Sequence, residues 1–448
     1  MAKHLNEGIE FPMYFYGQSF IFSLFEVGLI SASYSLCGIS DVGIKLTMLL
    51  LWTIGVIFFY KTLTQLNGRN AWAPLLITIL LIFCPAWAVW SMKARGGYLT
   101  SFLLSSLFCY VILNDRFNKR RITYLLLGLI LIIIYECQPI WIPGLAPIIV
   151  YQLMRSKEIR FSLNFILGVV FGYAFFLFYI HTTSSTGAIS LVMAPDNILK
   201  SFSMIPMRIF HNMTGSYYHW QWIDLNWGTN FLAVCYTFLI LAILSSSLYF
   251  IFKKKVLMPL FYIFALSVLF TLTYSSFSEL YNARHLLPLM AYSLLMFFMF
   301  MDRFVGKAFY FTICAFFISL GAISLFSFKD YKMENHGKAL LLEVISYLEK
   351  EDIQYTFCSN GLMQWQITFY SQERIISRSI HNSDRYPAYV DKVNRALDTS
   401  NAQVALVGAW GNQPTLEPKR VMFIEDEYYI YLNPSRSLLK AQKFILPD

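Results

Sequence analysis

GIKLTMLLLWTIGVIFFY, residues 43–60, is an almost uncharged run about as long as the hydrocarbon core of a bilayer is thick. Ten further apolar segments accompany it along the first 330 residues: 20–37, 72–90, 98–113, 122–135, 139–154, 161–180, 231–252, 257–274, 286–301 and 308–328. We therefore predict an α-helical polytopic membrane protein with about ten or eleven transmembrane helices.

The composition excludes an ordinary soluble protein. Hydrophobic residues make up 57% of the chain and charged residues 14%, and the mean hydropathy is +0.53. A soluble protein of 448 residues would have too little polar surface with these values. The net charge of +9 does not indicate a nucleic-acid partner, because Lys and Arg concentrate in short connections such as 114–121 and 253–255.

The distribution of cations predicts which side of the membrane each connection occupies. Five connections on alternate turns hold most of the Lys and Arg of the membrane part: 61–70, 114–121, 155–160, 253–255 and 302–307. The positive-inside rule assigns them to the cytoplasm. The opposite side then receives 91–97, 181–229, 275–285 and everything after Lys329. Because this side has the long loop 181–229 and the whole C-terminal tail, we expect the substrates to bind there.

The segment 20–37 has two interpretations, because Glu26 and several serines dilute its hydrophobicity. Either it crosses the membrane and the N-terminus is cytoplasmic, or it lies along the interface and the N-terminus is outside. The stretch after Met1 is polar and acidic, and it does not have the pattern of a cleavable signal peptide.

The composition changes after residue 329, which predicts two domains, 1–329 in the membrane and 330–448 as a small extracytoplasmic α/β domain. Within the second domain we predict strands at 355–360, 374–379 and 403–410, helices at 337–349 and 386–399, and a terminal hairpin at 420–434. We expect this domain to bind the acceptor or to stabilise the membrane part.

The turn WSMKARGGY, residues 90–98, places two cations on the side where the positive-inside rule predicts few. Lys93 and Arg95 suit an anionic ligand such as a phosphate, and Gly96 and Gly97 would let the backbone approach it closely. The alternative is a pair of interfacial cations that extend to lipid headgroups.

A second polar cluster is SSFSELYNARHLLP, residues 275–288, on the same predicted side. Its candidate substrate-site residues are Glu279, Tyr281, Arg284 and His285. Arg284 suits a phosphate because a guanidinium donates two parallel hydrogen bonds. An ion pair between Arg284 and Glu279 that only stabilises the turn is equally compatible with the sequence.

Two carboxylates are candidates for function because ionisable residues in or beside membrane segments are unusual: Glu136, at the boundary of an apolar segment, and Glu26, within 20–37. The alternative for each is an interfacial carboxylate that reaches water. The seven cysteines show neither a disulfide framework nor CxxC spacing, and the histidines have no HxxxH or HExxH spacing. The sequence therefore contains no recognisable metal-binding motif.

Four stretches in order resemble a known series: FPMYFYGQSF (11–20), LCGISDVGIKL (36–46), CPAWAVWSMKARGGY (84–98) and LYNARHLLPL (280–289). The chain resembles bacterial integral-membrane glycosyltransferases of the GT-C fold, which are relatives of the protein O-mannosyltransferases and of the lipid A aminoarabinose transferase. The resemblance covers nearly the whole chain, including the soluble tail.

This resemblance implies that a sugar passes from a polyprenyl-phosphate donor to a glycan, lipid or protein acceptor at the outer face of the cell (inner) membrane. In such an inverting displacement a carboxylate takes the acceptor proton, while cations, often with a divalent metal ion, stabilise the departing phosphate. Lys93, Arg95 and Arg284 match the phosphate-binding role, and Tyr16 and Gln18 lie in the YGQ stretch of the series.

The chain departs from this family at its beginning. Relatives usually have one more transmembrane helix and an acidic motif with the catalytic aspartate before the YGQ stretch. Here no residue is assigned as the base, and the carboxylates near this point are Glu7, Glu10 and Glu26. Two alternatives to an active transferase therefore remain: a truncated, non-catalytic homologue that binds the donor, and a lipid or glycan transporter.

Overall fold

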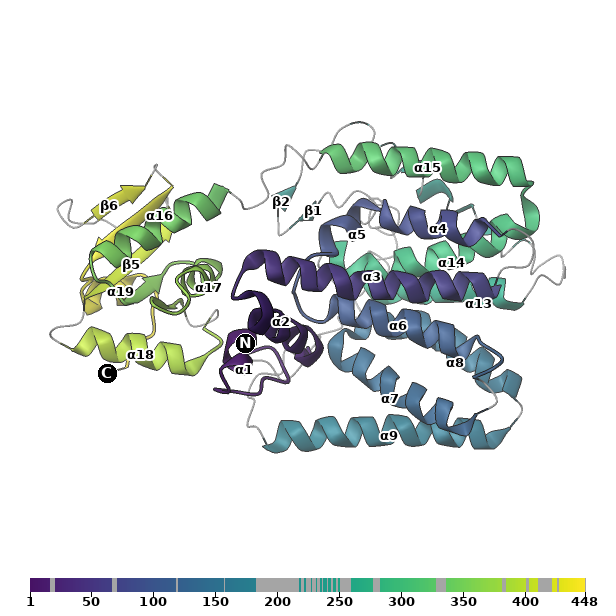
Figure 1. The fold of residues 1–448 in the computed structure, drawn as a ribbon, viewed down its shortest axis with the longest axis horizontal. Helices are drawn as coiled ribbons and strands as arrows, with labels where there is room; N and C mark the ends of the chain where they lie inside the picture. The colour runs from purple at the N-terminus through teal and green to yellow at the C-terminus, as the bar shows by residue number, and fades with distance from the viewer. Residues whose placement is uncertain are drawn as a thin grey trace. The chain divides into compact units, whose positions relative to one another are not determined.

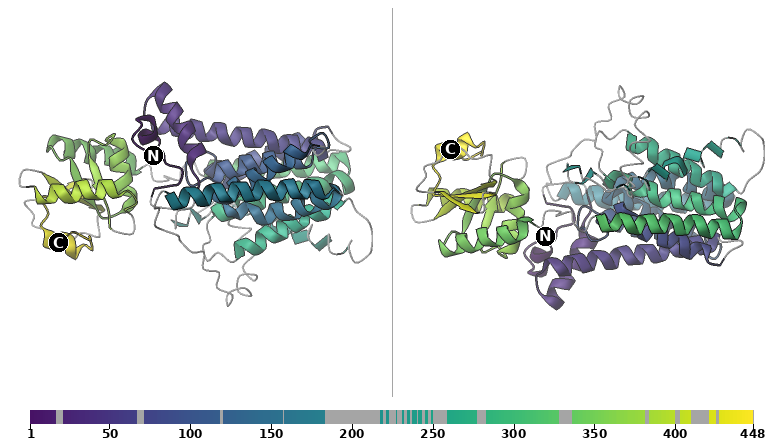
Figure 2. Two further views of the ribbon diagram at one scale, coloured as in Figure 1. Left: turned by 90° about the horizontal axis from the view of Figure 1, so that it is seen from below. Right: turned by 90° about the horizontal axis from the view of Figure 1, so that it is seen from above.

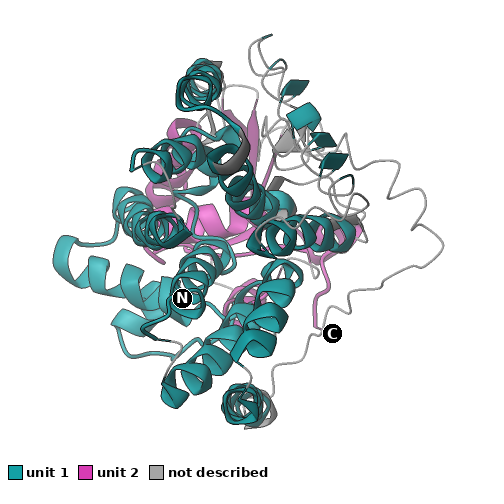
Figure 3. Ribbon diagram, turned by 90° about the vertical axis from the view of Figure 1, so that its right-hand side faces the viewer, with its two compact units in different colours: residues 1–15, 19–331 teal, residues 16–18, 332–448 magenta. Residues whose placement is uncertain are grey.

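A computed structural model describes the chain at residues 1–16, 21–66, 71–117, 120–156, 158–182, 217–218, 221–222, 259–276, 283–327, 336–380, 384–399, 403–409, 421–424 and 427–447, and at scattered positions from 227 to 249. The contacts divide it into two compact units, coloured separately in Figure 3. Unit 1 comprises 1–15 and 19–331, and unit 2 comprises 16–18 and 332–448. The sequence did not predict that 16–18 belong with the C-terminal unit.

Unit 1 is a bundle of helices (Figure 1). Its described helices are α1 (Ala2–Asn6), α2 (Leu24–Cys37), α3 (Asp41–Leu66), α4 (Ala73–Ile82), α5 (Pro85–Trp90), α6 (Tyr98–Ile112), α7 (Arg121–Cys137), η1 (Pro139–Trp141), α8 (Ile142–Ser156), α9 (Ile159–Thr182), α13 (Pro259–Ser276), η3 (Ala283–Leu286), α14 (Leu287–Phe304) and α15 (Lys307–Ser327). Most predicted apolar segments are thus confirmed as helices, whereas 231–252 lies largely outside the described residues.

Two of the described helices are long and apolar enough to cross a membrane, α3 and the 159–179 part of α9. Several other apolar helices are shorter, which weakens the prediction of ten or eleven full crossings. The predicted segment 72–90 is broken into α4 and α5 at Phe83 and Cys84, where Pro85 opens the second helix. Proline lacks the N–H that a continuous helix needs at this point.

Helix α2 lies at the end of the bundle where α3 begins, and it runs across the direction of α3 (Figures 1 and 2). It has 14 residues and ends at Gly38 with φ of 78°. A helix of this length spans about 21 Å, which is shorter than the roughly 30 Å hydrocarbon core. The structure therefore shows a helix in this segment that is shorter than a full crossing.

Glycines allow two helices of unit 1 to pack backbone to backbone. A Cβ atom added at Gly128 of α7 would lie 2.3 Å from the carbonyl oxygen of Phe165 in α9. One added at Gly168 of α9 would lie 2.1 Å from the carbonyl oxygen of Leu125. Small residues at such crossings are typical of helices that pack within membranes.

Unit 2 contains a five-stranded sheet in the order β4-β3-β5-β7-β6 (Figure 1). The strands are β3 (Tyr355–Cys358), β4 (Ile376–Arg378), β5 (Val404–Ala409), β6 (Val421–Ile424) and β7 (Tyr428–Leu432). Strands β3, β4 and β5 are parallel, and β7 is antiparallel to both β5 and β6. The predicted strands and the terminal hairpin are confirmed, with boundaries shifted by a few residues.

Helices cover both faces of this sheet because its central strands alternate their side chains. Cys358 and Val407 pack with α16 (His336–Lys350) and α17 (Gly361–Tyr370) on one face. Phe357 and Leu406 pack with α18 (Pro387–Asp398) and α19 (Arg436–Ala441) on the other. The sequence predicted α16 and α18 but missed α17 and α19. The short pair β1 (Tyr217–Tyr218) and β2 (Gln221–Trp222) in the 181–229 loop was also missed.

Candidate functional site

The predicted cationic turn, residues 91–97, connects α5 to α6 and is held between two aromatic rings. Trp90 ends α5 and Tyr98 begins α6, and their ring centroids lie 5.2 Å apart. The Nζ atom of Lys93 lies 5.2 Å from the centre of the Trp90 ring. This cation–π contact holds the ammonium group at the turn, where a cation can meet an anionic ligand.

Arg284 also lies near Tyr98 at the cationic turn, although it is distant in the sequence. It is half-buried in η3, just before α14. The guanidinium groups of Arg95 and Arg284 both act electrostatically on the phenol of Tyr98, which is 5% exposed. The two predicted phosphate ligands, 189 positions apart by their numbers (284 − 95), thus both lie within electrostatic range of one phenol, and η3 packs against α5.

Glu26 lies at the N-terminus of α6. Its carboxylate faces the backbone N–H groups of Gly97 and Thr100, and the Thr100 hydroxyl donates a hydrogen bond to Oε1 at 3.5 Å. The side chain is only 4% exposed. Burial raises the pKa of Glu26 to about 7, although these polar contacts oppose the shift.

The end of α7 lies against the other side of the cationic turn. The buried Gln138 side chain donates a hydrogen bond from Nε2 to the carbonyl oxygen of Gly96. A Cβ atom added at Gly97, where φ is 72°, would lie 3.0 Å from the Cβ atom of Cys137. The two glycines therefore bring the backbone close to α7.

Glu136 lies beside Gln138 and is more accessible than Glu26. Its side chain is half-buried, and Oε2 accepts a hydrogen bond of 3.0 Å from the hydroxyl of Tyr14. Burial and the neighbouring carboxylate raise the pKa of Tyr14 above its usual value, so the phenol remains a donor. The thiol of Cys137 interacts electrostatically with both Glu26 and Glu136, which places the two carboxylates in one neighbourhood.

Other sequence candidates lie elsewhere or are not described. Glu7 and Glu10 are exposed, and Glu7 pairs with Lys3 at 3.0 Å on α1. Tyr16 belongs to unit 2 and stacks on Tyr386 with ring centroids 4.5 Å apart. Gln18, Glu279, Tyr281 and the side chain of His285 lie outside the described residues, so the proposed ion pair with Arg284 is not tested.

Three residues of this neighbourhood were missed by sequence reasoning: Tyr14, Tyr98 and Gln138. Tyr98 borders the quoted cationic turn, and Gln138 follows Glu136 by two positions at the end of an apolar segment. A polar pair at that boundary was an available signal. Nothing in the sequence indicated that Tyr14 would contact a residue 122 positions away.

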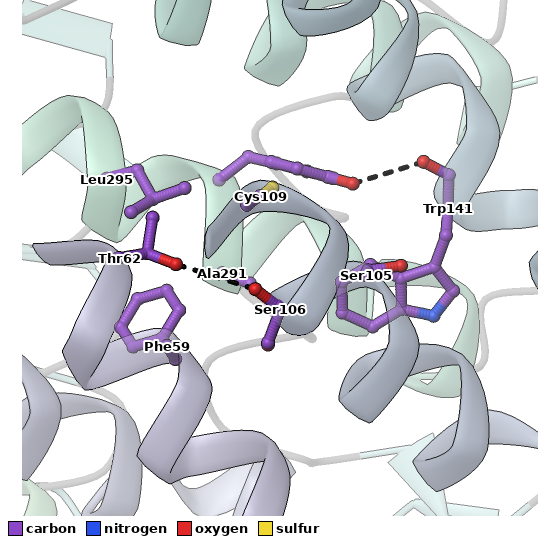
Figure 4. A pocket seen from close by; sticks show the side chains of 9 residues that line it. Phe59, Thr62, Ser105, Ser106, Cys109, Trp141, Ala291 and Leu295 are labelled. Carbon is purple, nitrogen blue, oxygen red and sulfur yellow. Dashed lines mark hydrogen bonds between the residues drawn. The ribbon is translucent and has the colours of Figure 1, made fainter. Parts of the chain in front are cut away.

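The described residues give two observations on possible ligand sites. No group of three or more His, Cys, Asp or Glu side chains among the described residues is arranged to hold a metal ion. Figure 4 shows a cavity of about 10 Å³ between α3, α6, η1 and α14, lined by residues such as Thr62, Ser106 and Trp141. It has room for one water molecule and is too small for a substrate.

Comparisons with known proteins identify the fold. No protein-family model matches the chain, and no curated protein matches it in sequence. The crystal structure of ArnT from Cupriavidus metallidurans bound to undecaprenyl phosphate is similar with a TM-score of 0.62 and 13% identity, over 97% of this chain and 92% of that chain. ArnT in the apo state gives a TM-score of 0.60 at 12% identity, over 98% and 92%. At this identity the likeness shows a shared fold.

Proposed function

We propose that this protein is a membrane glycosyltransferase that uses a polyprenyl-phosphate-linked sugar as donor. The observation that supports the proposal is that Arg95 and Arg284, which are distant in the sequence, both act electrostatically on Tyr98. Two guanidinium groups, with the Lys93 ammonium on the same turn, suit the phosphate of such a donor. The fold of ArnT, one structure of which is bound to undecaprenyl phosphate, supports the same class of ligand.

The cations would contribute most when the sugar leaves the phosphate. At that moment the phosphate oxygen that was bonded to the sugar gains negative charge. Fixed positive groups beside that oxygen stabilise the transition state more than the ground state. Arg95 lies in the turn that leads into α6, and Arg284 lies in the 3₁₀ helix η3, which leads into α14. Because packed helices hold both segments, the two arginines need little rearrangement during the reaction.

Glu136 is the carboxylate that we assign to the acceptor's proton. It is half-buried and accessible, whereas Glu26 is buried and its oxygens are engaged by the backbone of α6. In the proposed step the acceptor hydroxyl oxygen bonds to the anomeric carbon and the bond from that carbon to the phosphate oxygen breaks. The electron pair of that bond goes to the phosphate, and the hydroxyl proton passes to Glu136.

The proposed donor and acceptor sites lie at the outer face of the inner membrane, with the C-terminal unit extracytoplasmic. The distribution of cations among the connections supports this orientation. The acceptor is a glycan, a lipid or a protein.

The test is sugar transfer by membranes that contain single variants. We expect Arg284→Ala and Lys93→Ala to lose transfer while membrane insertion stays normal, with exposed Arg160→Ala as a control that retains it. Glu136→Gln should lose transfer and keep donor binding, because the amide cannot accept the proton. Retained transfer in both cation variants would refute the proposed site. Donor binding by the wild type without any transfer would favour a non-catalytic homologue.

A further inference from the structure

We propose that Glu26 is a positioning residue that holds the cationic turn in its phosphate-binding shape by capping the first turn of α6. This inference rests on the proposed function, because it concerns the same turn. Glu26 comes from α2, and Thr100, to which it is hydrogen bonded, is 74 positions further along the chain. The contact therefore joins α2 to the start of α6, next to the cationic turn.

The Glu26 carboxylate provides a hydrogen-bond acceptor at the start of α6, where the helix itself provides none. The first N–H groups of a helix have no partner within the helix, and the residue before α6 is Gly97, which has no side chain to accept them. Glu26 accepts a hydrogen bond from the Thr100 hydroxyl, faces the N–H groups of Gly97 and Thr100, and places negative charge at the positive end of the helix dipole.

The turn is held from two directions. The Glu26 carboxylate faces the N–H group of Gly97. The Gln138 side chain donates a hydrogen bond to the carbonyl oxygen of Gly96, the preceding residue. Both glycines have φ of 72°, a conformation that a free chain leaves easily. These contacts flank Arg95 on one side and Tyr98 on the other, so they set where the Arg95 guanidinium and the Tyr98 ring lie.

The geometry also separates this role from catalysis. Glu26 is 4% exposed, and its oxygens already accept hydrogen bonds from α6. A base must reach the acceptor hydroxyl, directly or through one water molecule. Glu26 acts on the donor through the turn and does not need to contact it.

The two effects of the Glu26 charge predict opposite pH dependence. If the charge acted only by repelling the donor phosphate, protonation would strengthen binding. If it positions the turn, protonation weakens the cap and binding falls as the pH drops below the Glu26 pKa of about 7. The sign of the change therefore distinguishes positioning from simple electrostatics.

Other titratable groups lie on the elements around α2. They are Lys3, His4 and Glu7 on α1, Asp41 and Lys45 on α3, Arg95 and Tyr98 at the cationic turn, and Glu136 and Cys137 on α7. Of these, Cys137 interacts electrostatically with Glu26.

The experiment measures binding of the methyl ester of undecaprenyl phosphate to purified full-length protein in nanodiscs between pH 6 and pH 8. This diester keeps one negative charge throughout that range, so its own titration does not contribute. We expect wild-type affinity to fall several-fold toward pH 6. Glu26→Gln should bind about tenfold more weakly at pH 8 and show no pH dependence, in keeping with the loss of hydrogen bonds to a charged group.

Two further variants complete the test. Glu26→Asp should recover part of the affinity and the pH dependence, and Glu158→Gln, an exposed carboxylate in the 155–160 connection, should match the wild type. Unchanged or tighter binding by Glu26→Gln, or a wild-type affinity that rises toward pH 6, would overturn the positioning role. Failure of the wild type to bind the ester at any pH would instead refute the proposed function.

Discussion

At the residue scale, the structure places Arg95 and Arg284 near Tyr98, and Glu26 at the start of α6. Lys93, Arg95 and Arg284 were identifiable because cations are unusual on the predicted outer side. Glu26 was identifiable as an ionisable residue in an apolar segment. Its role at α6 was not, because a helix cap from 74 positions away leaves no local pattern.

The buried ion pair of unit 2 gives a test of residue energetics. Arg378 and Asp384 lie 3.0 Å apart with side chains 1% and 5% exposed. Burial lowers the pKa of Arg378 and raises the pKa of Asp384, so both charges are costly to keep in this place. Arg378 also donates to Asn394 and to the carbonyl oxygen of Ile445.

Removal of one partner leaves the other charge buried and alone. We expect Arg378→Met or Asp384→Asn to lower the free energy of unfolding by about 3–5 kcal/mol, and the double change to Met and Leu to cost less than either single change. Arg374→Met is the control, because its ion pair with Glu349 is exposed and should contribute about 1 kcal/mol or less. Chemical unfolding of the full chain measures these differences, and a strictly additive double variant would contradict the account.

At the element scale, hydrophobic periodicity located the helices but did not specify their direction or their breaks. The run 72–90 is apolar throughout, so its break before Pro85 required attention to a single proline. The direction of α2 depends on packing against α1 and α3, which the sequence of α2 does not contain. Parallel strands β3 and β5 were predictable because they are short apolar runs bounded by polar residues.

The crossing of α7 and α9 predicts a large effect from a small substitution. In Gly128→Ala the new methyl group would meet the Phe165 carbonyl at 2.3 Å, so the two helices must separate. We expect a loss of about 1–3 kcal/mol, seen as a lower melting temperature of the purified protein. Gly28→Ala in α2 is the matched control, because no atom lies within 4 Å of its added Cβ. Equal melting temperatures for the two variants would refute the close packing.

At the scale of the whole molecule, the sequence predicted a helical part followed by a small α/β part, and the likeness to ArnT extends over both. It did not predict that Tyr16 belongs to unit 2 and stacks on Tyr386. No local sequence pattern around either tyrosine specifies this contact. The order of the motifs in the sequence predicted the fold. That Arg95 and Arg284 both lie near Tyr98 became apparent only in the three-dimensional structure.

In the proposed site, the cations around Tyr98 bind the donor phosphate. The most direct measurement is the affinity of undecaprenyl phosphate for purified wild type, Arg95→Ala and Arg284→Ala, with Arg160→Ala as the control. We predict that each of the first two variants weakens binding about tenfold or more, because each removes a charge-assisted pair. Wild-type affinity in both variants would contradict the claim.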